Sequence, residues 1–489
     1  MYHDVLLTKV IIHIVLVGLL ITDVLHRRRG STGPRLDRML GVLVLISLFA
    51  YVNFGRFHGG IVVHISEMFH YAVAGKYFPE LGYDRLYGAA LVADAELAEP
   101  SLTHIRYARD LQTGGLISAK DLHSDTRFRD AFTPQRWQSF KQDLSYLLPR
   151  DRAEGWTFTL GDHGYNAPPP LVVVDWTLAN ALGRVDRISV HLLALLDVLL
   201  LAVAALAVWR VYGFRTAAIG AILLLSDLSG FDWIGGAFLR YGWLAAVVVA
   251  MCALERNRPL TAGLLLGSAA WLRLFPALFA AGVVLLALLR VVRSRQIDPS
   301  DLRLFMGLAL ASVFFVGTSL LVLDGFQVWQ DFQRKILLHT SGSYTNHLGL
   351  HKLFARGSLL LWLAQAGVVA AWLWCVPRVR ASQAVALGGW LIFAFADLAS
   401  YYYCWLILLI AWDPTASDDW RNQAHQAAVA GVQALGLAVA VLSRETIPAY
   451  EPMIYPVVSG ALLLLFAAWT LRILRTPPEA QGPTPDAVT

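Results

Sequence analysis

Repeated apolar runs, each about 15–25 residues long, set the strongest limit on what this chain can form. A helix of about 20 apolar residues crosses a hydrocarbon core roughly 30 Å thick. The short alternating segments of an outer-membrane barrel are absent from the sequence. Only 15% of the residues are charged, whereas soluble domains carry about 25%. The sequence therefore predicts an all-α polytopic membrane protein with about 12–14 membrane helices.

Positive charge gathers in the short segments between the apolar runs. HRRRGSTGPRLDR, at 26–38, follows the first run, and RVVRSRQIDPSDLR, at 290–303, follows a later one. Cytoplasmic loops carry such an excess of Lys and Arg, so the net charge of +5 reflects orientation and not nucleic-acid binding. The first run, residues 5–25, has no basic stretch before it, which predicts a retained helix with its N-terminus outside. We expect a multi-pass protein of the inner, cytoplasmic membrane.

One long polar segment, residues 57–167, separates the early apolar runs. It contains turn residues and amphipathic pieces such as RWQSFKQDLSYLL, and we expect it to form an extracytoplasmic lobe. The predicted layout comprises an extra N-terminal helix with a basic loop at 1–38, a core with the lobe at 39–412, a C-terminal helix pair at 413–473, and a Pro-rich, disordered cytoplasmic tail at 474–489.

The chain returns to the membrane at GYNAPPPLVVVDWTLANALG, residues 164–183. Its three prolines predict an extended lead-in, because each lacks an N–H and disfavours helix in the residue before it. Two interpretations stay open. The segment spans the bilayer if Arg210 and Arg215 are outside, and it inserts only partway if they are cytoplasmic. The charge rule favours partial insertion.

Glu67 lies in HISEMFHY, residues 64–71, shortly after an apolar run. Ionisable groups at a membrane edge are costly unless they are solvated or used in function. On the predicted topology, four separated segments reach the same outer side: the one around Glu67, residues 229–242, Arg273 and residues 340–352. Their coincidence predicts a site at the outer membrane surface.

Glu67 is the candidate catalytic residue, because a carboxylate within hydrogen-bond reach of an acceptor hydroxyl can take its proton. Arg273 and Arg240 are candidate phosphate-binding residues, because a guanidinium can hold a phosphate through paired hydrogen bonds. The alternatives are a solvated loop carboxylate for Glu67 and snorkelling side chains for the two arginines.

A metal site is a further alternative for the histidines near Glu67. On a helix, however, the spacing of His64 and His70 turns their side chains apart, so we expect neither a metal nor another cofactor. The three cysteines have neither the pairing of a disulfide framework nor the spacing of a zinc site, and we expect them to pack in the core: Cys252, Cys375 and Cys404.

Five weak motifs follow one another along the chain: Glu67 and Tyr71 with Gly82 and Tyr87; Tyr165 with Pro168, Pro169 and Pro170; Ala262 and Gly263 with Arg273, Phe275 and Pro276; NHLGLHKLF from Asn346 to Phe354; and SYYYCW from Ser400 to Trp405. In this order they resemble the GT-C superfamily of polytopic glycosyltransferases. The closest resemblance is to its polyprenyl-phosphate-mannose-dependent mannosyltransferase-like branch, over about residues 39–412.

The resemblance implies a GT-C-like bundle that transfers a sugar outside the membrane. The donor would be a polyprenyl-phosphate-linked mannose, other hexose or pentose, and the acceptor a glycan, lipid or protein. Glu67 would be the base and Arg273 would lie near the phosphate. The remaining candidate substrate-binding residues are Arg240, Tyr71, His70, Tyr165, Asn346, His347 and Tyr403. The chain departs from the branch in having Glu instead of Asp at position 67, an extra first helix, and GGAFLRYG in place of a Gly-Gln-x-Asn patch.

Two further functions fit a polytopic chain of this kind. A transporter or lipid flippase would use the same cavity without chemistry, but it would place charges near the midplane, with broken helices in both halves. The position of the ionisable cluster at the outer edge, beside one large lobe, favours the enzyme. A catalytically silent member of the same superfamily is the third interpretation.

Overall fold

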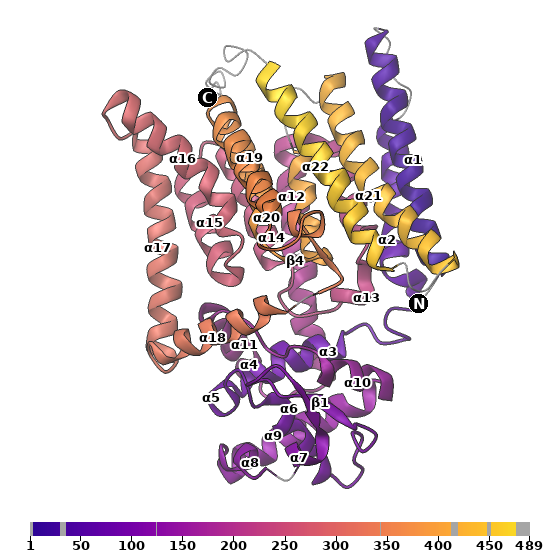
Figure 1. The fold of residues 1–489 in the computed structure, drawn as a ribbon, viewed down its shortest axis with the longest axis vertical. Coiled ribbons are helices and arrows are strands. Elements are labelled where there is room, and N and C mark those ends of the chain that lie inside the picture. The colour runs from indigo at the N-terminus through magenta and orange to yellow at the C-terminus, as the bar shows by residue number, and fades with distance from the viewer. Residues whose placement is uncertain are drawn as a thin grey trace.

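The computed structural model describes residues 3–29, 36–123, 125–342, 344–411, 419–446 and 451–475, and it is almost entirely helical (Figure 1). Seven of the described helices are long and apolar enough to cross a bilayer: α1 (His3–Arg28), α12 (Arg187–Leu225), α16 (Ala277–Ser294), α17 (Pro299–Val322), α19 (Leu359–Cys375), α21 (Trp420–Thr446) and α22 (Glu451–Arg475). The protein is therefore an all-α polytopic membrane protein, and the larger total expected from the sequence stays a prediction.

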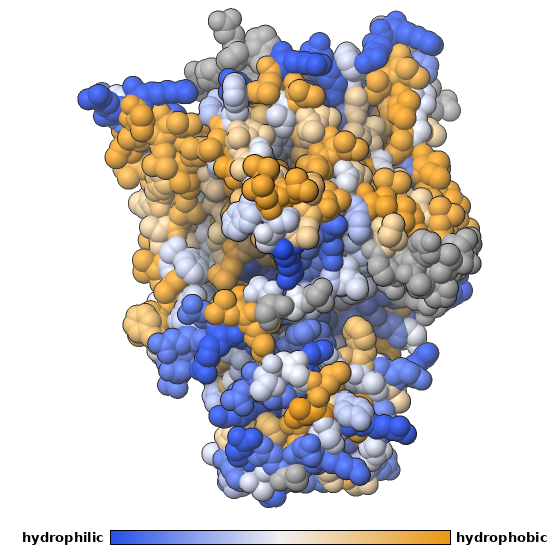
Figure 2. Space-filling view, viewed as in Figure 1, coloured by the Kyte–Doolittle hydropathy of each residue, from blue (hydrophilic) through white to orange (hydrophobic). Residues whose placement is uncertain are grey.

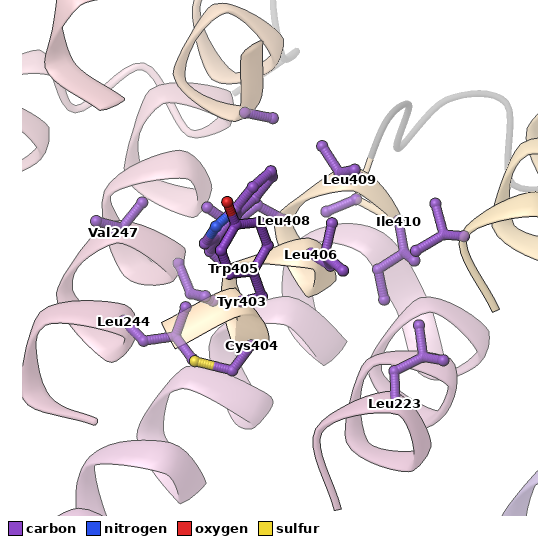
Figure 3. Packing of buried hydrophobic residues seen from close by; sticks show 14 of the residues in the cluster. Leu223, Leu244, Val247, Tyr403, Cys404, Trp405, Leu406, Leu408, Leu409 and Ile410 are labelled. Atoms are coloured by element: carbon purple, nitrogen blue, oxygen red, sulfur yellow. The ribbon is translucent and has the colours of Figure 1, made fainter. Parts of the chain in front are cut away.

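Shorter helices stand among these seven: α2 (Leu36–Tyr51), α14 (Gly242–Glu255), α15 (Pro259–Arg273), α20 (Ala381–Phe395) and the 3-10 helix η6 (Ser400–Leu409). Apolar side chains of η6 belong to the hydrophobic core of the bundle, where Trp405 lies across from Leu244 and Val247 of α14 (Figure 3). The free cysteines Cys252, Cys375 and Cys404 are all buried. The face of the bundle seen in Figure 2 is mostly hydrophobic, as lipid contact requires.

A mostly hydrophilic body lies below the upright helices (Figures 1 and 2). This lower body comprises α3 (Ile65–Glu67), the π-helix η2 (Met68–Val73), α4 (Ala74–Lys76), α5 (Phe78–Leu81), α6 (Leu86–Ala95), β1 (Tyr107–Arg109), β2 (Leu116–Ser118), α7 (Ala119–His123), α8 (Arg127–Asp130), α9 (Pro134–Leu147), η3 (Leu148–Arg150), α10 (Ala153–Gly161) and α11 (Pro169–Ala181). β1 and β2 pair antiparallel, with Tyr107 opposite Ser118. The lower body has its own apolar core, which includes Phe140 and Trp156.

The remaining elements are short and stand outside these two groups: η1 (Asn53–Gly55), α13 (Gly230–Ile234), α18 (Gln327–Ser341), β3 (His347–Leu348), η4 (Leu350–Lys352), η5 (Val376–Arg378) and β4 (Leu398–Ala399). β3 and β4 pair antiparallel, with His347 opposite Ala399.

The helix α12 runs away from the lower body and then reverses. Just before α12, the backbone N–H of Val185 donates to Asp143 of the lower body (2.9 Å). The helix is interrupted at Gly213, whose φ of +84° favours glycine over other residues. Beyond this point Arg215 pairs with Asp37 in the first turn of α2, at the opposite end of the bundle (2.5 Å).

The chain after α12 is back at the end of the bundle where α1 begins and α2 ends. Lys9, near the start of α1, donates to the carbonyl oxygen of Asp227 (3.2 Å), and Asn53, after the end of α2, donates to Asp232 (2.8 Å). Arg215 therefore shares the basic end of the bundle with the loop after α1. This arrangement agrees with partial insertion of α11, whose 13 residues cover only about 20 Å.

Two predictions concern residues outside the described ranges. The disordered tail expected at 474–489 lies almost wholly beyond Arg475, and the boundary expected between 412 and 413 falls in the gap before Asp419. The extra N-terminal helix is part of the bundle, because His13 of α1 hydrogen-bonds Gln433 of α21 (3.1 Å).

Candidate functional site

Glu67 and Arg240 form a two-point ion pair where the bundle meets the lower body. Nη2 of Arg240 donates to Oε1 of Glu67 (2.7 Å), and Nε faces Oε2. Both residues are buried, with exposed fractions of 8% and 7%. The backbone N–H of Glu67 donates to Nδ1 of His64 (3.3 Å), so His64 caps the short helix that ends at Glu67.

The position of Arg240 is fixed by a carboxylate on α12. Asp197 accepts hydrogen bonds from the backbone N–H groups of Arg240 (2.8 Å) and Tyr241 (3.0 Å), at the start of α14. A carboxylate is favourable there, because a helix N-terminus carries partial positive charge and unpaired N–H groups. The preceding loop is held by a hydrogen bond between Nε2 of His58 and the carbonyl oxygen of Gly235 (2.8 Å).

Tyr71 joins Arg240 to a second arginine, Arg273. Its hydroxyl accepts from Nη1 of Arg240 (2.9 Å) and Nη1 of Arg273 (3.1 Å), and it donates to Oδ1 of Asn166 (3.0 Å). Both guanidinium groups also lie over its ring, at 4.5 and 4.9 Å from the centroid. Tyr71 belongs to a single π-helical turn, η2, a distortion that is frequent at functional sites.

Arg273 keeps free donors although it is buried. It is the last residue of α15, and Leu274 has a positive φ of +50° before Pro276 leads into α16. Only 9% of Arg273 is exposed, and its Nε and Nη2 have no partner among the described residues. Leaving such donors unpaired in the interior costs about 1–3 kcal/mol or more for a charged group. An anion at this point would remove that cost.

Aromatic residues surround the two arginines. The ring of Tyr165 lies 5.4 Å from that of Tyr71, and its hydroxyl donates to Asp175 of α11 (2.7 Å). From η6, Tyr402 accepts a long hydrogen bond from Arg240 (3.4 Å), and the guanidinium of Arg240 lies 5.6 Å from the ring centre of Tyr401. Residues from five separate parts of the chain therefore meet at Arg240 and Arg273.

Glu67 is held in its charged form. Burial alone raises its pKa, but the charge of Arg240 outweighs burial, so the net pKa is lowered. The pKa of His64 falls to about 4, chiefly because of burial, which agrees with the neutral ring needed to accept the N–H of Glu67. The site thus holds one anion against two cations, and it carries net positive charge.

Four of the sequence-predicted site residues have other hydrogen-bond partners. Nε2 of His70 bonds the hydroxyl of Tyr87 (2.8 Å) inside the lower body. The other three lie around the β3–β4 pair. His347 donates from Nδ1 to Asp397 (2.6 Å). The hydroxyl of Tyr403 donates to the carbonyl oxygen of Leu348 (2.9 Å), and the carbonyl oxygen of Asn346 accepts from Ser400 (2.8 Å). Glu67, Arg240, Arg273, Tyr71 and Tyr165 are the members that the fold gathers directly.

Sequence reasoning missed three members of the network: Asn166, Asp197 and Tyr402. Asn166 stands beside Tyr165 in the segment before the prolines, and Asp197 is a lone carboxylate in an apolar run. A carboxylate in such a run is itself a signal. No group of three or more His, Cys, Asp or Glu side chains within the described ranges is arranged to hold a metal ion.

Comparison with known proteins adds no relative. Neither the protein-family models, nor curated proteins, nor solved structures give a match to this chain.

Proposed function

We propose that the protein is a membrane glycosyltransferase of GT-C-like architecture that moves a sugar from a polyprenyl-phosphate-linked donor to a hydroxyl acceptor. One observation carries the proposal. Buried Arg273, with two guanidinium nitrogens unpaired among the described residues, lies one tyrosine away from an oriented, anionic Glu67. A phosphate site and a carboxylate base are the two groups that such a transfer requires.

Arg273 would hold the donor phosphate. A guanidinium matches the geometry of phosphate oxygens and can bind two of them. In the transfer, negative charge grows on the departing phosphate, and a fixed cation already in place stabilises that charge without reorganisation. Tyr71 contributes by holding Arg273 and Arg240 in one arrangement through its hydroxyl.

Glu67 would act on the acceptor. In an inverting transfer, the acceptor oxygen attacks the anomeric carbon, the bond from that carbon to the phosphate oxygen breaks, and the phosphate leaves with the bonding electrons. The hydroxyl proton passes to the carboxylate of Glu67. The two-point contact with Arg240 fixes the direction of the carboxylate, and its remaining lone pairs are free to accept a proton as the hydroxyl becomes acidic.

The reaction would take place on the extracytoplasmic side. Support comes from charge: Arg215 and the arginines that follow α1 and α16 belong to the end of the bundle remote from Glu67, and basic ends are cytoplasmic. The polyprenyl chain would remain among the apolar helices while its phosphate reaches Arg273.

The test is transfer of radiolabel from polyprenyl-phosphate-linked mannose, a second hexose and a pentose, in membranes that contain the wild type, Glu67→Gln or Glu99→Gln. Glu99 is an exposed carboxylate of the lower body and serves as the matched control. Label should reach a new product with the wild type and Glu99→Gln only. Transfer by Glu67→Gln would remove the base assignment. Folded wild type that moves no label from any donor would refute the transferase, and transport of intact donor across vesicles would then favour the flippase.

A further inference from the structure

A second, polar cavity of about 730 Å³ lies between the lower body and α18. Its walls come from the turn after α5, from the end of α17 and from one face of α18; in Figure 1 α18 crosses the lower end of the helices near α5. None of the residues that contact Arg273 or Glu67 through hydrogen bonds lines it. Its volume is within the range of small-molecule sites, about 300–1,000 Å³.

Lys335 of α18 lines this cavity without a partner. Only 6% of the residue is exposed, and within the described part of the chain its ammonium makes neither a hydrogen bond nor an ion pair. Burial lowers the pKa of Lys335 to about 8, although nearby Asp84 and Asp162 favour the charged form. A buried amine of this kind is costly unless a ligand satisfies its three donors.

The other lining groups define the ligand that fits. The side chains of Asp84 and Asp324 accept no hydrogen bond from a described residue, and the amide of Gln112 is also unpaired there. Asp84, Asp324 and Asp331 balance Lys335, Arg85 and Arg334 among the lining residues, so the cavity offers no excess positive charge to hold a phosphate. Hydroxyl groups suit this mixture, because each hydroxyl can donate to a carboxylate and accept from an ammonium or amide. The rings of Phe78 and Tyr83 supply apolar walls.

The cavity continues along the lower body. A neighbouring cavity of about 630 Å³ shares four lining residues with it: Asp84, Arg85, Leu111 and Gln112. Together the two adjoining cavities form a polar groove. A row of neighbouring aromatic rings runs from the groove to the site: Tyr83 is stacked on Tyr165 at 6.2 Å, and Tyr165 meets the ring of Tyr71 edge-on.

We propose that this groove binds a neutral, hydroxyl-rich oligosaccharide, with Lys335 donating to it and Asp84 accepting from it. The inference rests on the proposed function in one respect: the bound oligosaccharide would be the acceptor, held in the groove while its terminal hydroxyl approaches Glu67. Binding itself requires no transfer, so the two proposals can fail separately.

The experiment measures binding of the purified, full-length protein in detergent to an array of neutral hexose and pentose oligosaccharides, with phosphorylated oligosaccharides and anionic-lipid vesicles as separate arms. Lys335→Met removes the unpaired ammonium, and Asp84→Asn removes an acceptor. Lys120→Met makes the same change of charge at an exposed site of the lower body outside both cavities. Thermal unfolding of each variant shows that it is folded.

We expect the wild type and Lys120→Met to bind at least one neutral oligosaccharide, and Lys335→Met and Asp84→Asn to bind it at least tenfold more weakly. Glu99→Gln should bind like the wild type, since Glu99 is exposed and lines neither cavity. Wild type that binds nothing, or only the phosphorylated or vesicle arm, would overturn the proposal. Binding without any transfer would keep the groove and refute the transferase.

Discussion

Glu67 and Arg240 are 173 positions apart in sequence, yet they form a buried two-point ion pair between the lower body and the bundle. The pair joins a short capped helix to the N-terminus of α14, and through Tyr71 it reaches Arg273. A buried pair of this kind adds little net stability, but separating the partners is expensive because one charge is left alone. The pair therefore specifies how the two parts fit together.

We first expect the two charges to be strongly coupled. Arg240→Gln leaves the Glu67 carboxylate buried without a counterion, which should cost about 3–5 kcal/mol of stability. The double variant Glu67→Gln/Arg240→Gln removes both charges and should recover part of that loss. Thermal unfolding in detergent of the wild type, both single variants and the double variant measures the coupling energy. Strictly additive losses would contradict a direct pair.

Arg273→Gln should weaken use of the lipid-linked donor. Losing a charge-assisted contact to phosphate costs about 1.5–3 kcal/mol, equivalent to roughly 10–150-fold in kcat/KM. Arg258→Gln is the matched control, since Arg258 is exposed at the other end of the same helix. Steady-state transfer assays of both variants provide the comparison. Equal losses of kcat/KM in the two variants would show that the net charge of the protein matters and the position of Arg273 does not.

Tyr71→Phe removes the hydroxyl that accepts from both arginines and donates to Asn166. We expect a loss of about 1–3 kcal/mol in stability, because buried donors lose their acceptor. Transfer should fall as well, through poorer placement of Arg273. Asn166→Ala should give a smaller effect, since it leaves both guanidinium contacts in place. Thermal unfolding and transfer are measured on the same preparations, and an unaffected Tyr71→Phe would argue against the network.

Close packing of α15 on α17 should be needed to hold Arg273. A Cβ at Gly263 would clash with the carbonyl oxygen of Leu304, whereas one at Gly317 of α17 would meet nothing within 4 Å. Gly263→Ala should therefore destabilise by about 1–3 kcal/mol through overpacking. Gly317→Ala should be neutral or slightly stabilising, as Ala favours helix. Thermal unfolding of the wild type and both variants measures these effects. Equal melting temperatures for Gly263→Ala and Gly317→Ala would contradict the close contact between α15 and α17.

Stability should decline in acid because of a histidine between α18 and the lower body. Burial and nearby His163 lower the pKa of His339 to about 4. The unfolded chain, with an ordinary pKa near 6.5, binds more protons between these values, so stability falls as pH drops from about 6.5 to 4. His339→Gln should reduce this loss, whereas His104→Gln, at an exposed position, should not. Melting temperatures measured from pH 7 to pH 4 give the result.

Features set by local chemistry were predictable from the sequence. Pro276 favours a helix break just before it, and α15 ends at Arg273 while α16 begins at Ala277. Of the three prolines expected to form an extended lead-in, Pro168 is extended, whereas Pro169 and Pro170 begin α11. Proline is tolerated in the first turn of a helix, because the N–H that it lacks would have no partner within the helix there.

The partners of the site residues were not predictable in this way. Tyr71 bonds Asn166 across 95 positions, and Arg240 bonds Asp197 across 43. Such contacts depend on how helices pack, which no short sequence pattern encodes. The same limit applies to His70, whose neighbours in sequence suggested the site but whose ring points to Tyr87 in the lower body.

The reversal of α12 at Gly213 affects the topology of every later segment. Whether the chain has crossed the membrane an odd or an even number of times decides on which side each later loop lies. Without the reversal, every segment after α12 would be turned upside down. The loop of Arg240 would then open beside Arg215 and Asp37, a bilayer's thickness from Glu67. A glycine that contacts no member of the network thus decides whether the acid and its arginine can meet.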